Sequence, residues 1–274
     1  MSLTGILGHL SVRIRIVALA AIPVLGFLVN GIAFTGGESE VESAFDSVKR
    51  SAALADSTRD FKAGLTAMLM TAREFAERPS EELVKAFQKG HGISAAGLDL
   101  IARSIDSSQQ KDVEQIKGKL WELQASFNDL TQEQEGMGFN DAQGTRAALA
   151  NAAAQLERSV KVDLAWVPEA DRYSLLTSLL ILRRADAEYR LHRMQTTWDL
   201  FFQELKKFNE VFAGIESVGA EAKKQQVNDR LRTYATNLTQ WNRRASNIER
   251  LLTAIAEVSD QMLPAADKII AAAR

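Results

Sequence analysis

Apolar side chains recur every three or four residues along almost the whole of this 274-residue chain. Side chains at this spacing share one face of an α-helix, and each such helix must bury its apolar stripe against neighbouring helices. Only four prolines interrupt the pattern, and no segment shows a convincing strand pattern. The spacing therefore predicts an all-α fold, an up-and-down helical bundle. A clear example is the stripe of Val113, Ile116, Leu120, Leu123, Phe127 and Leu130.

Turn-forming residues divide the region after residue 38 into six helices. Breaks are expected at Arg78-Pro79-Ser80, at 106–108, at 136–141, at Trp166-Val167-Pro168 and at 214–219. Ser80 is the expected N-cap of the second helix. The fifth helix is expected to continue from Pro168 through Ile215. Helices of about 40 to 50 residues would be roughly 60–75 Å long at 1.5 Å per residue, which exceeds the diameter of a compact domain. We expect a rod, or two bundles stacked end to end.

The segment Ile16–Phe34 runs for 19 residues without a charge. As a helix it would span roughly 28 Å, close to the thickness of the hydrocarbon core of a bilayer. Basic residues precede it and acidic residues follow it, so the pattern places residues 1–15 in the cytoplasm, a transmembrane helix at 16–34, and residues 35–274 outside the cytoplasm. The alternative is a cleaved signal peptide with Gly31 and Ala33 near its cleavage site.

The composition excludes several classes of function. The chain has no cysteine, and its three histidines are far apart in the sequence, so neither disulfides nor a metal site is expected. A formal net charge of -2 and a pI near 6.0 argue against a general nucleic-acid partner. No phosphate-binding glycine loop or hydrolase motif is present. We therefore expect a protein that is not an enzyme, with no catalytic residues, no metal and no cofactor.

The segment LLILRRADAEYRLHR (Leu179–Arg193) carries the most unusual concentration of charge. Arg183, Asp186, Arg190 and Arg193 are spaced three, four and three residues apart, so they share one helical face, whereas Arg184 and Glu188 can pair on an adjacent face. One interpretation is a solvated surface with internal ion pairs. The other is that some of the arginines bind an anion, because the guanidinium group matches a carboxylate with two parallel hydrogen bonds.

Two segments resemble the helical bimodular sensor domain of bacterial methyl-accepting chemotaxis proteins. The first is GFNDAQGTRAALANAAAQLE (Gly138–Glu157), which is similar to a Gly-x-Asp-x-x-x-Gly loop before an amphipathic helix, although Asn140 stands at the aspartate position and Ala150 replaces an arginine. The second is Leu179–Arg193, which is similar to Leu-x-Leu-Arg-Arg-x-Glu-Lys-Asp-Phe-x-x-x-Arg, with Ala187 in place of the lysine. The resemblance covers the chain from about Glu38 to its end.

The resemblance implies six helices, two long and four short, in two stacked four-helix bundles, each able to hold a small organic acid between helices. It implies basic ligand-binding residues on two helices. Arg59 and Lys62 are the nearest equivalents on the first helix, and Arg183 and Arg184 are the candidates on a later one. Asp186 and Glu188 would hold those arginines in place, and Tyr189 matches the aromatic position.

The resulting hypothesis is the sensory region of a transmembrane chemoreceptor in the bacterial inner membrane, with its sensor domain in the periplasm. It would bind a small carboxylate-type ligand, form a parallel homodimer and signal by helix displacement. A second transmembrane helix and a cytoplasmic signalling region would be expected beyond residue 274. One alternative is the sensor domain of a histidine kinase, and another is a membrane-anchored helical protein that interacts with partners without sensing.

Overall fold

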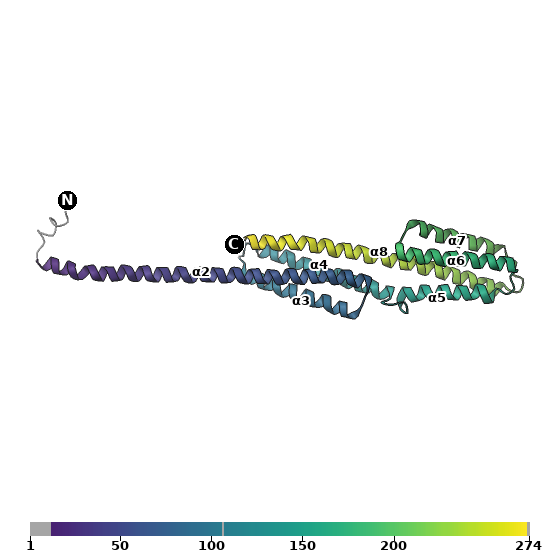
Figure 1. Cartoon of the computed structure of the whole chain (residues 1–274), viewed down its shortest axis with the longest axis horizontal. Helices are drawn as coiled ribbons and strands as arrows, with labels where there is room; N and C mark the ends of the chain where they lie inside the picture. The colour runs from purple at the N-terminus through teal and green to yellow at the C-terminus, as the bar shows by residue number, and fades with distance from the viewer. Residues whose placement is uncertain (1–11, 106, 273–274) are drawn as a thin grey trace.

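A computed structural model describes residues 12–105 and 107–272 of the chain. The predicted all-helical class is confirmed. In chain order, the elements are α2 (Val12–Glu77), α3 (Glu81–Ser104), α4 (Gln110–Met137), α5 (Gly144–Arg158), the π-helix η1 (Ser159–Asp163), α6 (Glu169–His192), α7 (Gln195–Gly214) and α8 (Glu221–Ala272). The helices lie roughly along one axis, and the molecule is strongly elongated (Figure 1).

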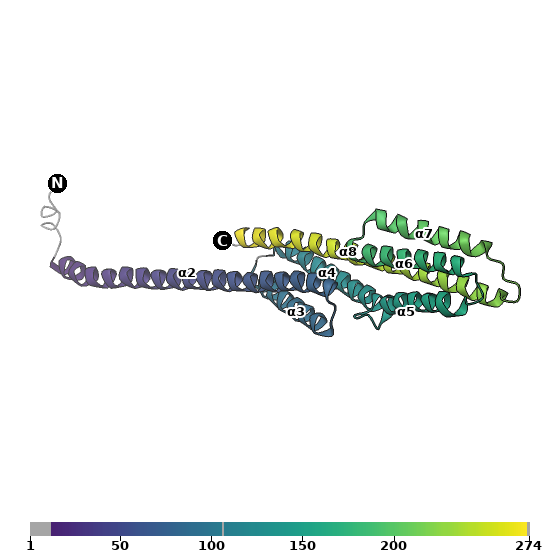
Figure 2. The same cartoon turned by 45° about the vertical axis from the view of Figure 1, so that its right-hand side comes forward.

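The described helices enclose two separate hydrophobic cores that lie one after the other along this axis. The first core is formed by α3, α4, the later part of α2 and the later part of α8. The second is formed by α5, η1, α6, α7 and the earlier part of α8. Burial of each large apolar side chain stabilises the folded state by about 1.5–3 kcal/mol relative to an exposed side chain. Figure 2 shows the same order from a second direction, with α8 running along both bundles.

Local sequence signals set the ends of several helices. Ser80 is the N-cap of α3, where its Oγ accepts a hydrogen bond from the Leu83 N–H at 3.3 Å, as predicted. Hydrogen bonds from the backbone N–H of Glu82 itself and from the Ser80 hydroxyl lower the pKa of the Glu82 carboxyl group. α4 ends at Gly138, whose φ of 99° is a backbone conformation that residues with a side chain rarely adopt.

Small residues allow α2 and α3 to approach closely. A Cβ added to Gly97 would lie 2.8 Å from the Ser57 carbonyl oxygen and 3.0 Å from the Phe61 nitrogen, both backbone atoms of α2. Ser94 lies on the same side of α3, and its Oγ donates a hydrogen bond to the Phe61 carbonyl oxygen at 3.1 Å. These residues therefore set the distance between the two helices.

The predicted fifth helix is wrong in its extent, because the chain reverses in its middle. α6 ends at His192 and α7 begins at Gln195. Between them Arg193 adopts a left-handed conformation with a φ of 52°. Its guanidinium donates to Ser246 Oγ at 2.8 Å and to Glu249 Oε2 at 3.1 Å, both on α8. α6 and α7 pack against each other as an antiparallel pair instead of forming one rod.

The early part of α2 extends beyond the first bundle. The core on this helix begins at Leu54, which is 4% exposed. Val41, Phe45 and Val48 belong to the apolar stripe that the sequence predicts, yet they are 67–75% exposed. The early part of α2 extends past the other labelled helices (Figure 1), so this stripe has no apolar cover within the described chain.

The prediction of a transmembrane helix at 16–34 is wrong, as is the predicted location in the bacterial inner membrane. Across residues 12–105 and 107–272, no helix combines the length and the apolar character needed to cross a membrane. Residues 16–34 do not form a helix of their own, because they are continuous with a 66-residue helix that contains Pro23 and carries charged residues further on. The extracytoplasmic placement of 35–274 depended on this span. Of the predicted N-terminal segment 1–15, residues 1–11 lie outside the described residues.

The close contact of α2 and α3 leads to a stability prediction. Replacing Gly97→Ala should lower the free energy of unfolding by about 1–3 kcal/mol, because the new methyl group meets backbone atoms that cannot move aside. Gly92→Ala on the same helix is the matched control, since a Cβ there has nothing within 4 Å. That variant should gain roughly 0.5–1 kcal/mol from helix propensity. Urea unfolding measures both, and equal effects of the two variants would contradict the packing argument.

Candidate functional site

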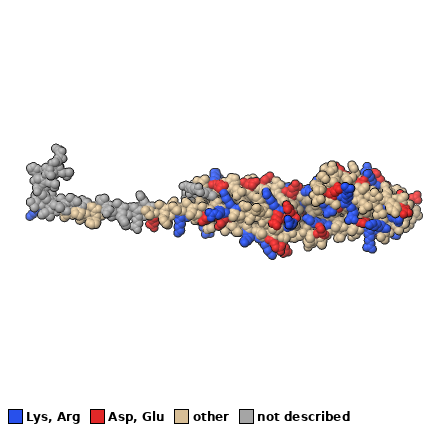
Figure 3. All heavy atoms as spheres, viewed as in Figure 1, with Lys and Arg blue, Asp and Glu red and all other residues tan. Residues whose placement is uncertain are grey.

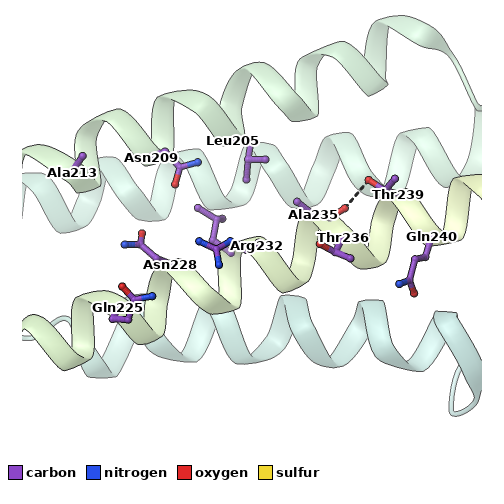
Figure 4. Close-up of a pocket in the computed structure, with 11 residues that line it drawn as sticks. Leu205, Asn209, Ala213, Gln225, Asn228, Arg232, Ala235, Thr236, Thr239 and Gln240 are labelled. Carbon is purple, nitrogen blue, oxygen red and sulfur yellow. Dashed lines mark hydrogen bonds between the residues drawn. The ribbon is translucent and has the colours of Figure 1, made fainter.

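The second bundle contains an open groove between α7 and α8, with a cavity volume of about 620 Å³. Figure 4 shows its lining, with Leu205 and Asn209 directed from α7 toward α8. A groove of this size between helices is suitable for a small-molecule ligand. Its lining consists of Leu205, Asn209, Ala213, Gln225, Asn228, Leu231, Arg232, Ala235, Thr236, Thr239 and Gln240.

The groove exists because α7 packs along α6, whereas α8 packs along α5. A hydrogen bond from Ser178 Oγ to Glu204 Oε2 at 3.3 Å joins α7 to α6. At one end of the groove, Lys224 Nζ on α8 donates to the Ala213 carbonyl oxygen at 3.0 Å and lies 5.7 Å from the centre of the Phe212 ring. The helices are therefore tied at the far tip of the bundle, and the middle stays open.

Aromatic side chains connect α6, α7 and α8 near the other end of the groove. The ring of Tyr189 on α6 lies 4.8 Å from Trp198 on α7 and 6.3 Å from Trp241 on α8, measured between ring centres. Tyr189 is also fixed by a hydrogen bond from its hydroxyl group to Asn242 Oδ1 at 2.6 Å. The groove thus has two anchored ends and an accessible centre.

The chemistry of the lining is mostly neutral and polar. Its carboxamides and hydroxyls can donate and accept hydrogen bonds, and apolar side chains such as Leu205 and Leu231 cover part of the wall. Among the described lining residues, Arg232 is the one charged side chain. Its side chain is 76% exposed, and its Nη1 lies 3.7 Å from Asp229 Oδ1, at the outer limit of an ion pair. The arrangement suits a small molecule that carries one carboxylate and further hydrogen-bonding groups.

A buried polar network fixes α8 against α6 beneath the groove. The Tyr234 hydroxyl donates to Asp186 Oδ2 at 2.8 Å, and Arg190 Nε donates to Asp186 Oδ1 at 2.7 Å. Tyr234 is completely buried and Asp186 is 4% exposed. Burial, with the Asp186 carboxylate second, raises the pKa of Tyr234, so the phenol stays protonated and remains a donor. The network sets the position of the α8 turn that carries Ala235 and Thr236.

The predicted site residues on α6 pair with carboxylates of the chain itself. Arg183 forms an ion pair with Glu157 on α5, and its side chain is 45% exposed. Glu157 also accepts from Lys161, and these two cations lower its pKa, with Lys161 the larger cause. Arg184 bonds Glu188 one turn further along α6 at 2.8 Å, and this pair raises the pKa of Arg184. Asp186 holds Arg190 rather than Arg183.

The predicted site residues on α2 lie in the other bundle. Arg59 Nη1 bonds Asp56 Oδ1 at 2.9 Å on the surface, and Lys62 pairs with Asp267 near the end of α8. Asp267 and Tyr234, which contacts α6 near Arg183, are separated by roughly 50 Å along α8 at 1.5 Å per residue. The two basic pairs therefore cannot hold one ligand together. Ligand binding by either pair alone stays a prediction.

Sequence reasoning missed the residues of the groove. The signal was present on the last helix, where Gln225, Asn228, Arg232 and Thr236 recur every three or four residues. Amides and hydroxyls occupy this face beside the apolar stripe of Leu231 and Leu238, where an ordinary surface would carry more Lys and Glu. Within the described ranges, no group of three or more metal-ligating side chains comes together.

The buried network gives a prediction for the second bundle. Tyr234→Phe should lower the free energy of unfolding by about 1.5–3 kcal/mol, because Asp186 keeps its burial and loses a hydrogen bond to its charged oxygen. Tyr173→Phe removes a hydroxyl from a side chain that is 61% exposed, and it should change stability by less than about 0.5 kcal/mol. Chemical denaturation of both variants tests this, and a Tyr234→Phe variant as stable as the unaltered chain would count against the network.

A scan against protein-family models finds no match, and a search of curated proteins finds no similar sequence. The resemblance to the helical bimodular sensor domain therefore rests on the two segments described above.

Proposed function

We propose that this chain is the sensory part of a signalling protein and that it binds a small carboxylate-bearing molecule in the groove between α7 and α8. The observation that carries the proposal is the groove itself, which is open in the middle, anchored at both ends and lined by neutral polar groups with one arginine. The planar guanidinium of Arg232 can bind a carboxylate with two hydrogen bonds. The amides of Asn209 and Asn228 would bind further polar groups of the ligand.

The same groove supplies a mechanism for signalling. A ligand that bridges α7 and α8 favours the arrangement of these helices in which it makes more contacts, and it shifts the population toward that arrangement. Because α8 is buried in both cores, a displacement of its earlier part in the second bundle would be transmitted to its later part in the first bundle. This is the behaviour expected of a sensor of the chemotaxis-receptor type, or of one coupled to a histidine kinase.

Binding measurements on the purified chain test the proposal and separate the two candidate sites. Isothermal titration calorimetry with a panel of small mono- and dicarboxylates should find at least one ligand. Arg232→Gln should weaken its binding by about tenfold or more, since a charged hydrogen bond is lost. Arg250→Gln, at an exposed position of α8 outside the groove lining, should bind normally.

The outcome that would contradict the groove is equally specific. Full affinity in Arg232→Gln together with lost affinity in Arg183→Ala would place the ligand beside α6 instead. If no member of the panel binds, the proposed sensory function is contradicted.

A second proposal concerns a partner, because α2 carries an exposed apolar stripe. Val41, Phe45 and Val48 are spaced four and three residues apart, the pattern by which two helices form a coiled coil. We propose that two copies of the chain pair in parallel through this part of α2. Each copy would then cover the stripe of the other.

Sedimentation velocity tests the pairing. The unaltered chain should sediment as a dimer, and Phe45→Glu should shift it to the monomer because the interface would bury an unpaired charge. Leu180→Glu changes a side chain that is 64% exposed on α6, and it should leave the dimer intact. A monomeric unaltered chain, or a dimer that persists in Phe45→Glu, would contradict the pairing.

A further inference from the structure

A second hollow lies where the two bundles meet, between the end of α4 and the middle of α8. Its cavity volume is about 650 Å³. It differs in charge from the groove between α7 and α8, because it contains groups of both signs. The residues that line it are Gln132, Glu133, Glu135, Gly136, Gln240, Arg243 and Arg244.

Part of this lining is fixed by contacts within the protein. Both oxygens of Glu133 are engaged, because Arg244 Nη1 donates to Oε2 at 2.9 Å and Asn247 Nδ2 donates to Oε1 at 2.9 Å. A Cβ at Gly136 would lie 2.1 Å from Arg244 Nη1, so the guanidinium lies directly against the α4 backbone. Thr145 Oγ1 donates to the Gly136 carbonyl oxygen at 3.0 Å and ties this turn to α5. The charges of Glu133 and Arg244 compensate each other and form a rigid, neutral wall.

The other two charged residues of the hollow, Arg243 and Glu135, do not compensate each other or pair with a further side chain of the described chain. Arg243 and Glu135 are both exposed, and within residues 12–105 and 107–272 neither forms an ion pair. They contribute one positive and one negative charge to the same hollow. Gln132 and Gln240 add two carboxamides that can donate and accept hydrogen bonds.

We propose that this hollow binds a small zwitterion of the α-amino-acid class. Arg243 binds the carboxylate of the ligand through its planar guanidinium, and Glu135 binds the ammonium group. The amides of Gln132 and Gln240 bind polar groups of the ligand side chain. A dicarboxylate meets repulsion from Glu135 and a diamine meets repulsion from Arg243, so opposite charges on one molecule are required.

The proposal does not depend on the function assigned to the groove. Arg232 lines the groove and is absent from the lining of the hollow, whereas Arg243 and Glu135 line the hollow and are absent from the groove. Gln240 lines both, so the two binding sites are neighbours on α8. Substitutions can therefore separate them, provided that Gln240 is left unchanged.

The test uses calorimetry on the full chain with glycine, L-serine and L-glutamine as zwitterionic probes. At least one should bind with a dissociation constant of about 1 mM or tighter. Two analogues of L-glutamine remove one charge each: 4-carbamoylbutanoate lacks the ammonium group, and 4-aminobutanamide lacks the carboxylate. Each analogue should bind at least about tenfold more weakly, because one charged contact is lost.

Matched variants complete the test. Arg243→Gln and Glu135→Gln should each weaken zwitterion binding by about tenfold or more, whereas Arg232→Gln and Arg250→Gln should leave it unchanged. Circular dichroism checks that each variant keeps its helical content. Three results would overturn the proposal. They are no binding by any of the three probes, analogues that bind as tightly as L-glutamine, and full affinity in both Arg243→Gln and Glu135→Gln. Loss of binding in Arg232→Gln alone would place the zwitterion in the groove and overturn it as well.

Discussion

The architecture depends on one helix that is buried in two cores at once. α8 contributes Val227, Leu231, Tyr234 and Leu238 to the second core, and Leu251, Ile255, Val258 and Met262 to the first. Neither core is complete without it, so the hydrophobic effect holds the two bundles to one continuous rod. Both candidate binding sites also lie along this helix. Whatever shifts α8 in one bundle must therefore be accommodated by the packing of the other.

The sequence predicted the helical class and much of the core because helical periodicity records burial directly. The stripe from Val113 to Leu130 is buried as expected. The reversal between α6 and α7 could not be read in the same way, because Arg193 carries no signal for a left-handed turn and its conformation depends on partners on α8. The exposed stripe from Val41 to Val48 shows a second limit of helical periodicity. An apolar stripe predicts that a helix face packs against another helix, but it does not tell whether that helix belongs to the same chain.

The candidate site was harder to predict than the fold because charge is ambiguous in a sequence. The arginines of the Leu179–Arg193 segment attracted attention, yet in the structure Arg183, Arg184, Arg190 and Arg193 each bond a carboxylate of the chain itself. Such internal pairs are common on helical surfaces, where Lys and Arg alternate with Asp and Glu, as Figure 3 shows for one face of the molecule. The groove and the hollow could not be predicted from the sequence, because each is formed by tertiary packing, of α8 beside α7 and of α8 beside α4.

The length of α2 has a mechanical consequence. From Val12 to Leu54 this helix extends for roughly 60 Å at 1.5 Å per residue, and Leu54 is the first of its described side chains that is buried. A stiff rod of that length acts as a lever whose pivot is the first bundle. A tilt of only about one degree at the pivot would move the far end by about 1 Å. A packing change too small to disturb either core would thus become a displacement comparable to the helix shifts that bias known molecular switches.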